Sequence, residues 1–192
     1  MAARQDGTLV SWWRYFLIFM GVSFNKIKAV HELSPADEAA LENRRRALRA
    51  IAKDPVVLEL LAEAGRRPPA HVNQEVWRKL GANDSFVAGF RHPRFRAAVE
   101  REPGSIDLEV SLSAPAGEKV AFTAKPRLFS HFDQNAHRFP MAGKEYTEVH
   151  LKVTFDPDSE VKAVELGVPV FNETGVAVGS LVAMVPYASL RV

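Results

Sequence analysis

The chain has 192 residues, of which 47% are hydrophobic and 25% are charged, proportions that are ordinary for one globular domain with a short appendage. It contains no cysteine, which excludes disulfides, thiolate metal sites, iron–sulfur clusters and a cysteine nucleophile. The formal net charge is +2, and so small an excess does not indicate a nucleic-acid-binding protein. The composition therefore indicates a folded domain and leaves its function open.

The most unusual stretch is the apolar run at residues 9–24, in which Arg14 is the only charged residue. Aromatic rings with a polar atom favour the membrane interface, and apolar side chains favour the deeper layer. The run is slightly shorter than the ~20 residues of a spanning helix, and Arg14 and Lys26 near its ends could reach the two surfaces. We therefore expect residues 1–33 to form a helical membrane anchor with a connector, in contact with lipid through residues 9–24. The expected anchor side chains are Trp12, Trp13, Tyr15, Phe16, Leu17, Ile18, Phe19 and Met20.

Two other interpretations of this run stay open. A cleaved signal peptide would use residues 15–24 as its apolar core, but no small-x-small cleavage site follows them. A buried helix of a soluble protein could also contain an apolar run of this length. Basic residues flank both ends almost equally, so they define the orientation of an anchor only weakly.

Residues 34–100 have the signals of consecutive helices. Ser34 can cap a helix that begins at Pro35, and the acidic Asp37 suits its first turn. We expect this long helix to end near residue 53, because Asp54 followed by Pro55 repeats the start signal. Shorter helical pieces are expected at residues 73–80, 83–90 and 93–100.

The hydrophobic period changes after residue 104. Alternating apolar and polar residues predict strands, and the short turns between most of them predict antiparallel neighbours. Helices that precede an antiparallel sheet define an α+β domain, here expected over residues 34–192. The segment 125–144 has no clean period. The expected strands are residues 106–113, 119–123, 145–155, 161–171 and 176–185.

The chain after the anchor resembles the Cache domains, the PAS-like extracytoplasmic sensor modules of bacteria. The likeness rests on the helix pair at 48–64, the hairpin at 106–123, the long loop at 124–144, and the closing strand pair at 164–190 with its Pro-Val and Gly-x-Leu-Val sequences. The resemblance implies an about five-stranded antiparallel PAS/Cache-like sheet behind a long helix. It also implies a location at the bacterial inner membrane, with the folded domain on the periplasmic side.

Two departures from the family pattern bear on function. The loop that often walls the ligand pocket in the family contains neither Trp nor Tyr here. Many family members continue into a second membrane helix and a signalling domain, whereas this sequence ends at Val192, soon after the last expected strand. We therefore expect a single Cache-like domain whose output, where it has one, lies in a separate protein.

Candidate binding residues gather in the irregular loop, where Arg127, His131, Asp133 and Arg138 could hold a small anionic ligand. An arginine can bind a carboxylate through two parallel hydrogen bonds. His131 and Asp133, together with His137, are also donor types of zinc or non-haem iron sites. These three residues all lie in one short loop, however. We therefore favour the interpretation that they form a polar surface, and we expect no metal or cofactor.

No Gly-rich phosphate loop, Gly-x-Ser-x-Gly elbow or His-Glu-x-x-His sequence is present, and we expect a non-enzymatic protein. The first hypothesis is an accessory subunit that docks on a larger respiratory, photosynthetic or transport complex of the inner membrane. The alternative is a sensor of a small carboxylate or amino acid that signals through a separate partner. Neither hypothesis involves nucleic acid.

Overall fold

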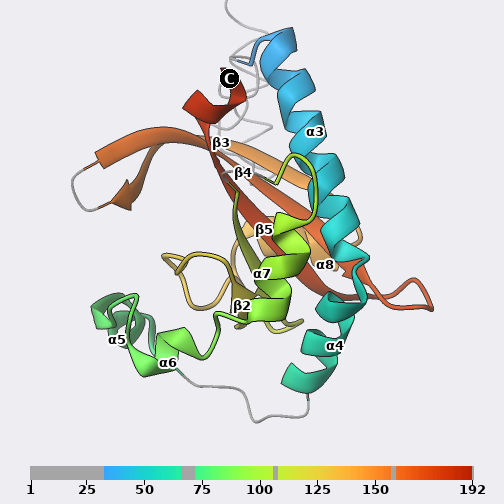
Figure 1. The fold of residues 1–192 in the computed structure, drawn as a ribbon, viewed down its shortest axis with the longest axis vertical. Coiled ribbons are helices and arrows are strands. Elements are labelled where there is room, and N and C mark those ends of the chain that lie inside the picture. The colour runs from blue at the N-terminus through green and yellow to red at the C-terminus, as the bar shows by residue number, and fades with distance from the viewer. Residues whose placement is uncertain (1–32, 66–71, 106–107, 157–158, 192) are drawn as a thin grey trace, which may run out of the picture.

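The computed structural model describes residues 33–65, 72–105, 108–156 and 159–191, and they form an α+β domain as predicted (Figure 1). The expected anchor lies outside these residues. No helix among the described residues is both long and apolar enough to cross a membrane. The elements are α3 (Pro35–Ala52), α4 (Pro55–Ala64), α5 (Gln74–Lys79), α6 (Ser85–Ala88), α7 (Pro93–Glu100), β1 (Glu109–Ser113), β2 (Lys119–Phe122), α8 (Asn135–Met141), β3 (Tyr146–Asp156), β4 (Ser159–Phe171), β5 (Ala177–Pro186) and the 3₁₀ helix η1 (Tyr187–Arg191).

The two long helices begin where their capping residues predict. The Ser34 hydroxyl accepts from the amide of Asp37 at 3.1 Å, and the Asp37 carboxylate accepts from the amide of Ser34 at 3.2 Å. This reciprocal pair satisfies two amides that the first turn of α3 leaves without helical partners. The Asp54 carboxylate caps α4 through one bond, which it accepts from the amide of Val56 at 2.9 Å.

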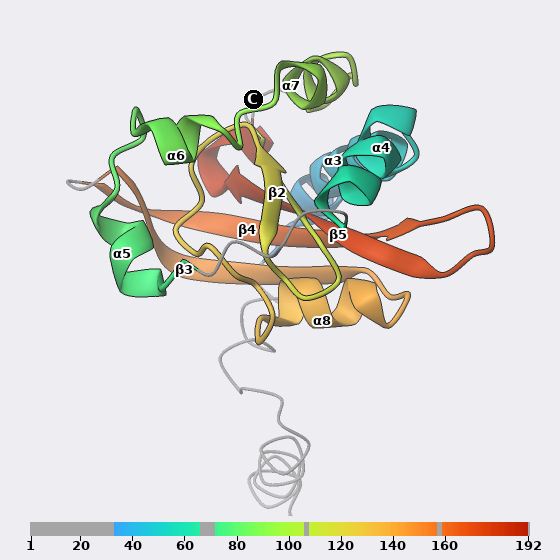
Figure 2. The same ribbon diagram turned by 90° about the horizontal axis from the view of Figure 1, so that it is seen from below.

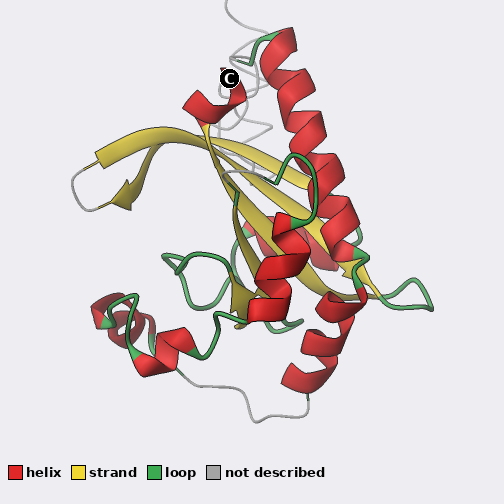
Figure 3. Cartoon of the chain, in the orientation of Figure 1, coloured by secondary structure: helices red, strands yellow, loops and turns green. Residues whose placement is uncertain are grey.

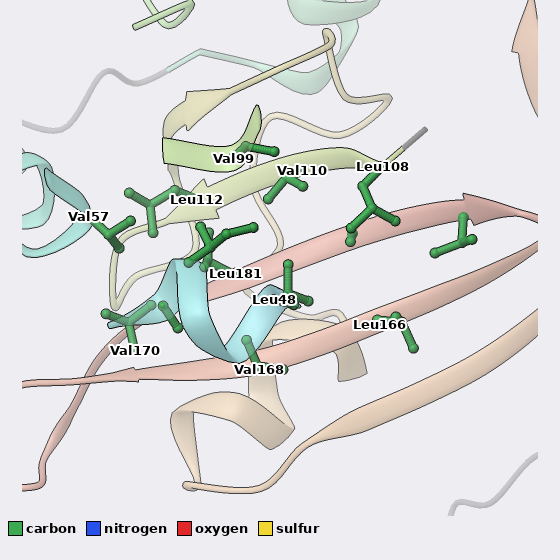
Figure 4. Close-up of a cluster of buried hydrophobic side chains, with 14 of the residues drawn as sticks. Leu48, Val57, Val99, Leu108, Val110, Leu112, Leu166, Val168, Val170 and Leu181 are labelled. Carbon is green, nitrogen blue, oxygen red and sulfur yellow. The ribbon is translucent and has the colours of Figure 1, made fainter. Parts of the chain in front are cut away.

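Five strands, drawn yellow in Figure 3, form one antiparallel sheet among the described residues. Their order is β2-β1-β5-β4-β3. Successive side chains of a strand point to opposite faces, so the register assigns each residue to one face. Leu112, Leu181 and Val168 lie in one row across β1, β5 and β4. All three are buried and face Leu48 of α3 and Val57 of α4 in the main core (Figure 4).

The opposite face of the sheet is covered partly by α8, which the sequence did not predict. α8 lies within the segment expected to be irregular, and it packs on the other side of the sheet from α3, α4 and α7 (Figure 2). The close approach depends on Gly167 of β4, because a Cβ atom there would lie 2.5 Å from the carbonyl oxygen of Ala136 in α8. Gly167 therefore lets the helix lie directly on the strands.

A methyl group at Gly167 tests this close approach. We expect Gly167→Ala to lower the free energy of unfolding by about 1–3 kcal/mol, since the overpacked helix must move away from the sheet. Urea unfolding followed by circular dichroism measures the change. Gly81→Ala is the matched control, because nothing lies within 4 Å of its added Cβ; equal stabilities of the two variants would contradict the proposed contact.

Candidate functional site

The segment between β2 and α8 is fixed to the domain by α5. The Trp77 indole donates to the carbonyl of Pro126 at 2.8 Å, and the Gln74 amide bonds the backbone of Arg127 and Phe129 at 2.9 and 3.0 Å. The Trp77 ring also contacts Phe129, at 5.2 Å between ring centroids. A second, small aromatic core therefore holds this segment beside the edge strand β2.

Beneath the segment lies a buried polar layer centred on Lys119 of β2. The Lys119 ammonium nitrogen lies 2.9 Å from the Ser113 hydroxyl and 2.8 Å from Nδ1 of His131. His137 of α8 lies beside this pair, with Nδ1 2.7 Å from the hydroxyl of Ser180 and Nε2 3.1 Å from the carbonyl of Pro115. These contacts satisfy polar groups that would be costly to bury alone.

The sheet register explains how the layer forms. Ser180 of β5 pairs with Ser113 of β1, and Ser113 pairs with Lys119 of β2. Ser113 and Ser180 therefore lie on the face that α8 covers. A register shift between Leu112 and Ser113 brings Lys119 opposite Ser113, and its amine lies 2.9 Å from the Ser113 hydroxyl. His131 and His137 then approach these side chains from the segment above them.

Burial disfavours positive charge throughout this layer. Desolvation lowers the pKa of Lys119 well below its usual value, although the carboxylate of Glu165 opposes the effect. Desolvation and the nearby Lys119 lower the pKa of His131 to about 2, and desolvation is also the main cause that lowers the pKa of His137. Both imidazoles are therefore neutral at pH 7.

The four predicted ligand-binding residues do not share one environment. Arg127, Asp133 and Arg138 are exposed, whereas His131 is buried and bonded to Lys119. His137 is the third residue of the alternative metal hypothesis, and its two ring nitrogens are hydrogen-bonded to Ser180 and to the carbonyl of Pro115. Their role in ligand binding stays a prediction.

A cavity of about 770 Å³ lies beside the same edge of the sheet, between the end of α4, α6 and the β1–β2 hairpin. Its volume falls within the range of small-molecule sites. The apolar part of its wall includes Leu60, Ala64, Phe86, Phe90, Ala116, Val120 and Phe129, and the polar part includes Glu63, His92, Glu118 and Lys119.

His92 is one of the polar residues in the wall of this cavity. Its Nδ1 atom is closed to solvent and has no hydrogen-bond partner among the residues that the structure describes, so it faces the protein and not the open cavity. The cavity thus combines apolar walls with a few polar side chains, which is the usual composition of a ligand site.

Comparisons with known proteins now identify the class to which this fold belongs. No protein-family model matches the chain, and no curated protein matches it in sequence. The solved structures it resembles include the E. coli DcuS sensor domain, with a TM-score of 0.51, 11% identity, and coverage of 82% of this chain and 96% of that one. The sensor domain of the V. cholerae histidine kinase DctB matches with a TM-score of 0.53 and 13% identity over 95% of this chain and 57% of that one. The fold is therefore that of the Cache/PAS-like sensor domains, as the sequence resemblance predicted.

The buried imidazoles predict a loss of stability in mild acid. Their folded-state pKa values lie below the unfolded value of about 6.5, so the unfolded chain binds more protons as the pH falls below that value. The free energy of unfolding should therefore fall between pH 7 and pH 5, by at most about 1.4 kcal/mol per pH unit for each proton. Urea unfolding at several pH values measures this slope.

His131→Asn separates this effect from other titrations, because Asn retains an acceptor for Lys119 without an imidazole. We expect the variant to show a shallower slope than the parent protein. Arg127→Gln, an exposed substitution in the same segment, is the control and should keep the parent slope. If the His131 variant keeps it too, the buried imidazole does not cause the acid sensitivity.

Proposed function

We propose that this protein is a sensory module that binds a small molecule and reports to a separate partner. The observation that carries the proposal is the cavity of about 770 Å³ with apolar walls and a few polar side chains, found in a fold shared with sensor domains. Fold alone does not define function, so the cavity provides the chemical support. The domain recognises a ligand and does not transform it.

The cavity wall defines the kind of ligand. Apolar side chains of the wall favour a molecule with an apolar body, and the polar residues Glu63, Glu118 and Lys119 favour a polar group on it. Phe129 belongs to the segment in which Arg127 was predicted to bind ligand, so the cavity and that segment are neighbours. We propose a carboxylate or amino acid with an apolar side chain as the ligand; Arg127 itself is exposed and is not part of the cavity wall.

The sensor hypothesis is better supported than the accessory-subunit hypothesis. Both matched structures are sensor domains, and this likeness offers no support for docking on a respiratory, photosynthetic or transport complex. In this proposal, the role of a partner protein is to receive the signal from the sensor domain.

We further propose that residues 9–24 hold the domain at the bacterial inner membrane, with residues 34–192 on the periplasmic side. The support is the apolar, aromatic-rich composition of this run. A membrane-held sensor domain would meet its ligands outside the cytoplasm, which agrees with the matched fold.

Filling the cavity tests the ligand site. In a thermal-shift screen of carboxylates and amino acids, a ligand at 100 times its Kd should add ~2.7 kcal/mol to stability. We expect Ala64→Phe to weaken that ligand at least tenfold, because the ring enters the cavity. Ala62→Phe, an exposed change on the same helix outside the cavity wall, should leave binding intact. The proposal fails if no compound stabilises the protein, or if Ala64→Phe binds as well as Ala62→Phe.

Charges in the apolar run test the anchor. We expect the double variant Phe16→Asp and Phe19→Asp to leave the membrane fraction of cells, since burying a carboxylate in hydrocarbon costs several kcal/mol. Phe132→Asp is the matched control, because Phe132 is a 60% exposed aromatic residue of the folded domain. Membrane retention of the double variant would show that residues 9–24 do not hold the protein there.

A further inference from the structure

A second cluster of polar side chains lies at the other edge of the sheet, away from the cavity. Glu148 and His150 belong to β3, and Glu165 belongs to the neighbouring β4. Glu148 pairs directly with Glu165 across the two strands. The adjacent Val149 and Val164 are buried in the main core, so the three polar residues point to the opposite face.

The three side chains bring their donor atoms together. Nε2 of His150 lies 3.2 Å from a carboxylate oxygen of Glu165 and 4.0 Å from one of Glu148. One donor atom from each residue lies within 4.8 Å of the other two. Zinc binds nitrogen and oxygen donors at about 2.0–2.2 Å in a tetrahedral arrangement, so two of its ligands lie about 3.3–3.6 Å apart. Small side-chain rotations would place all three donors around one ion.

The arrangement has features beyond a group of acidic residues. An imidazole converges with the carboxylates, and this mixture of donors suits transition metals rather than Ca²⁺, which takes six to eight oxygen ligands. Strand positions fix the three backbones rigidly. The Tyr146 hydroxyl donates to Glu148, which orients a candidate ligand in the way that outer hydrogen bonds orient ligands in metal sites.

The surrounding charge also favours a cation. Carboxylates directly opposite each other on neighbouring strands repel, and Glu148 and Glu165 are 14% and 16% exposed, so water screens them incompletely. Glu109 lies in the same row of the sheet, two strands away through Met184. A divalent ion between β3 and β4 would relieve this repulsion.

We propose that Glu148, His150 and Glu165 form a binding site for a divalent transition metal, with Zn²⁺ as the best-fitting ion. Three protein donors leave at least one position open for water or another ligand, as in open zinc sites. The site is independent of the proposed small-molecule cavity, whose wall contains no residue of β3 or β4.

Calorimetric titration of the tag-free full chain with Zn²⁺, after chelator dialysis, tests this site. We expect one equivalent to bind, and Glu165→Gln and His150→Gln each to weaken binding at least tenfold. Tyr146→Phe should weaken it about tenfold or more, as changes outside the ligand set do in metal sites. Two controls should bind as the parent does: Glu173→Gln, at an exposed turn, and His131→Asn, which removes a residue of the rival loop site.

Each outcome decides the proposal. Thermal unfolding of each variant without metal is the control for folding. In a folded variant, lost Zn²⁺ binding reports the loss of a metal-ligating side chain. Absence of Zn²⁺ binding, or equal binding by parent, Glu165→Gln and His150→Gln, overturns the site, and loss in His131→Asn alone assigns the metal to the loop. Ala64→Phe should keep Zn²⁺ binding, which separates this test from that of the cavity.

Discussion

The alternation of side chains along the strands divides the domain into an apolar side and a polar side, and the remaining features depend on this division. The rows that contain Leu112, Leu181 and Val168 give α3 and α4 a surface to cover. The same strands place Ser113, Ser180 and Glu165 on the other face. Burial of one face provides the stability of the domain, so the other face can contain charges and hydrogen-bonding groups that a core would exclude.

On the polar face, Lys119 is the group whose burial is most costly. Its amine is buried, and the hydrogen bonds that it makes to Ser113 and His131 replace only part of its hydration. Such a group is tolerated when the segment above it is rigid enough to keep both partners in place. α8 provides this rigidity through its contact with Gly167, and the aromatic cluster around Trp77 fixes the other end of the segment. The irregular sequence of this segment therefore adopts one defined conformation.

Sequence patterns predicted the α+β fold well because its main elements have local signals. Ser34 and Asp54 define helix starts through contacts within three residues, and period-two alternation located all five strands to within a few residues. α8 was missed because Pro140 lies inside it, and proline usually indicates a break in a helix.

The sites were harder to predict, since each joins residues far apart in the chain. The cavity brings α4 against a hairpin more than fifty residues later, and no local pattern encodes that contact. Glu148 and Glu165 meet only through the register of β3 and β4. His131 was predicted to bind a ligand, and its partner Lys119 lies in a strand whose alternation gave no sign of a buried amine.

Lys119 links the buried polar layer to the cavity. Desolvation lowers the pKa of its amine, and the carboxylate of Glu165 on the same polar face opposes this effect. Lys119 bonds His131 in the buried layer and also belongs to the cavity wall, so the segment that fixes His131 also fixes one polar group of the cavity.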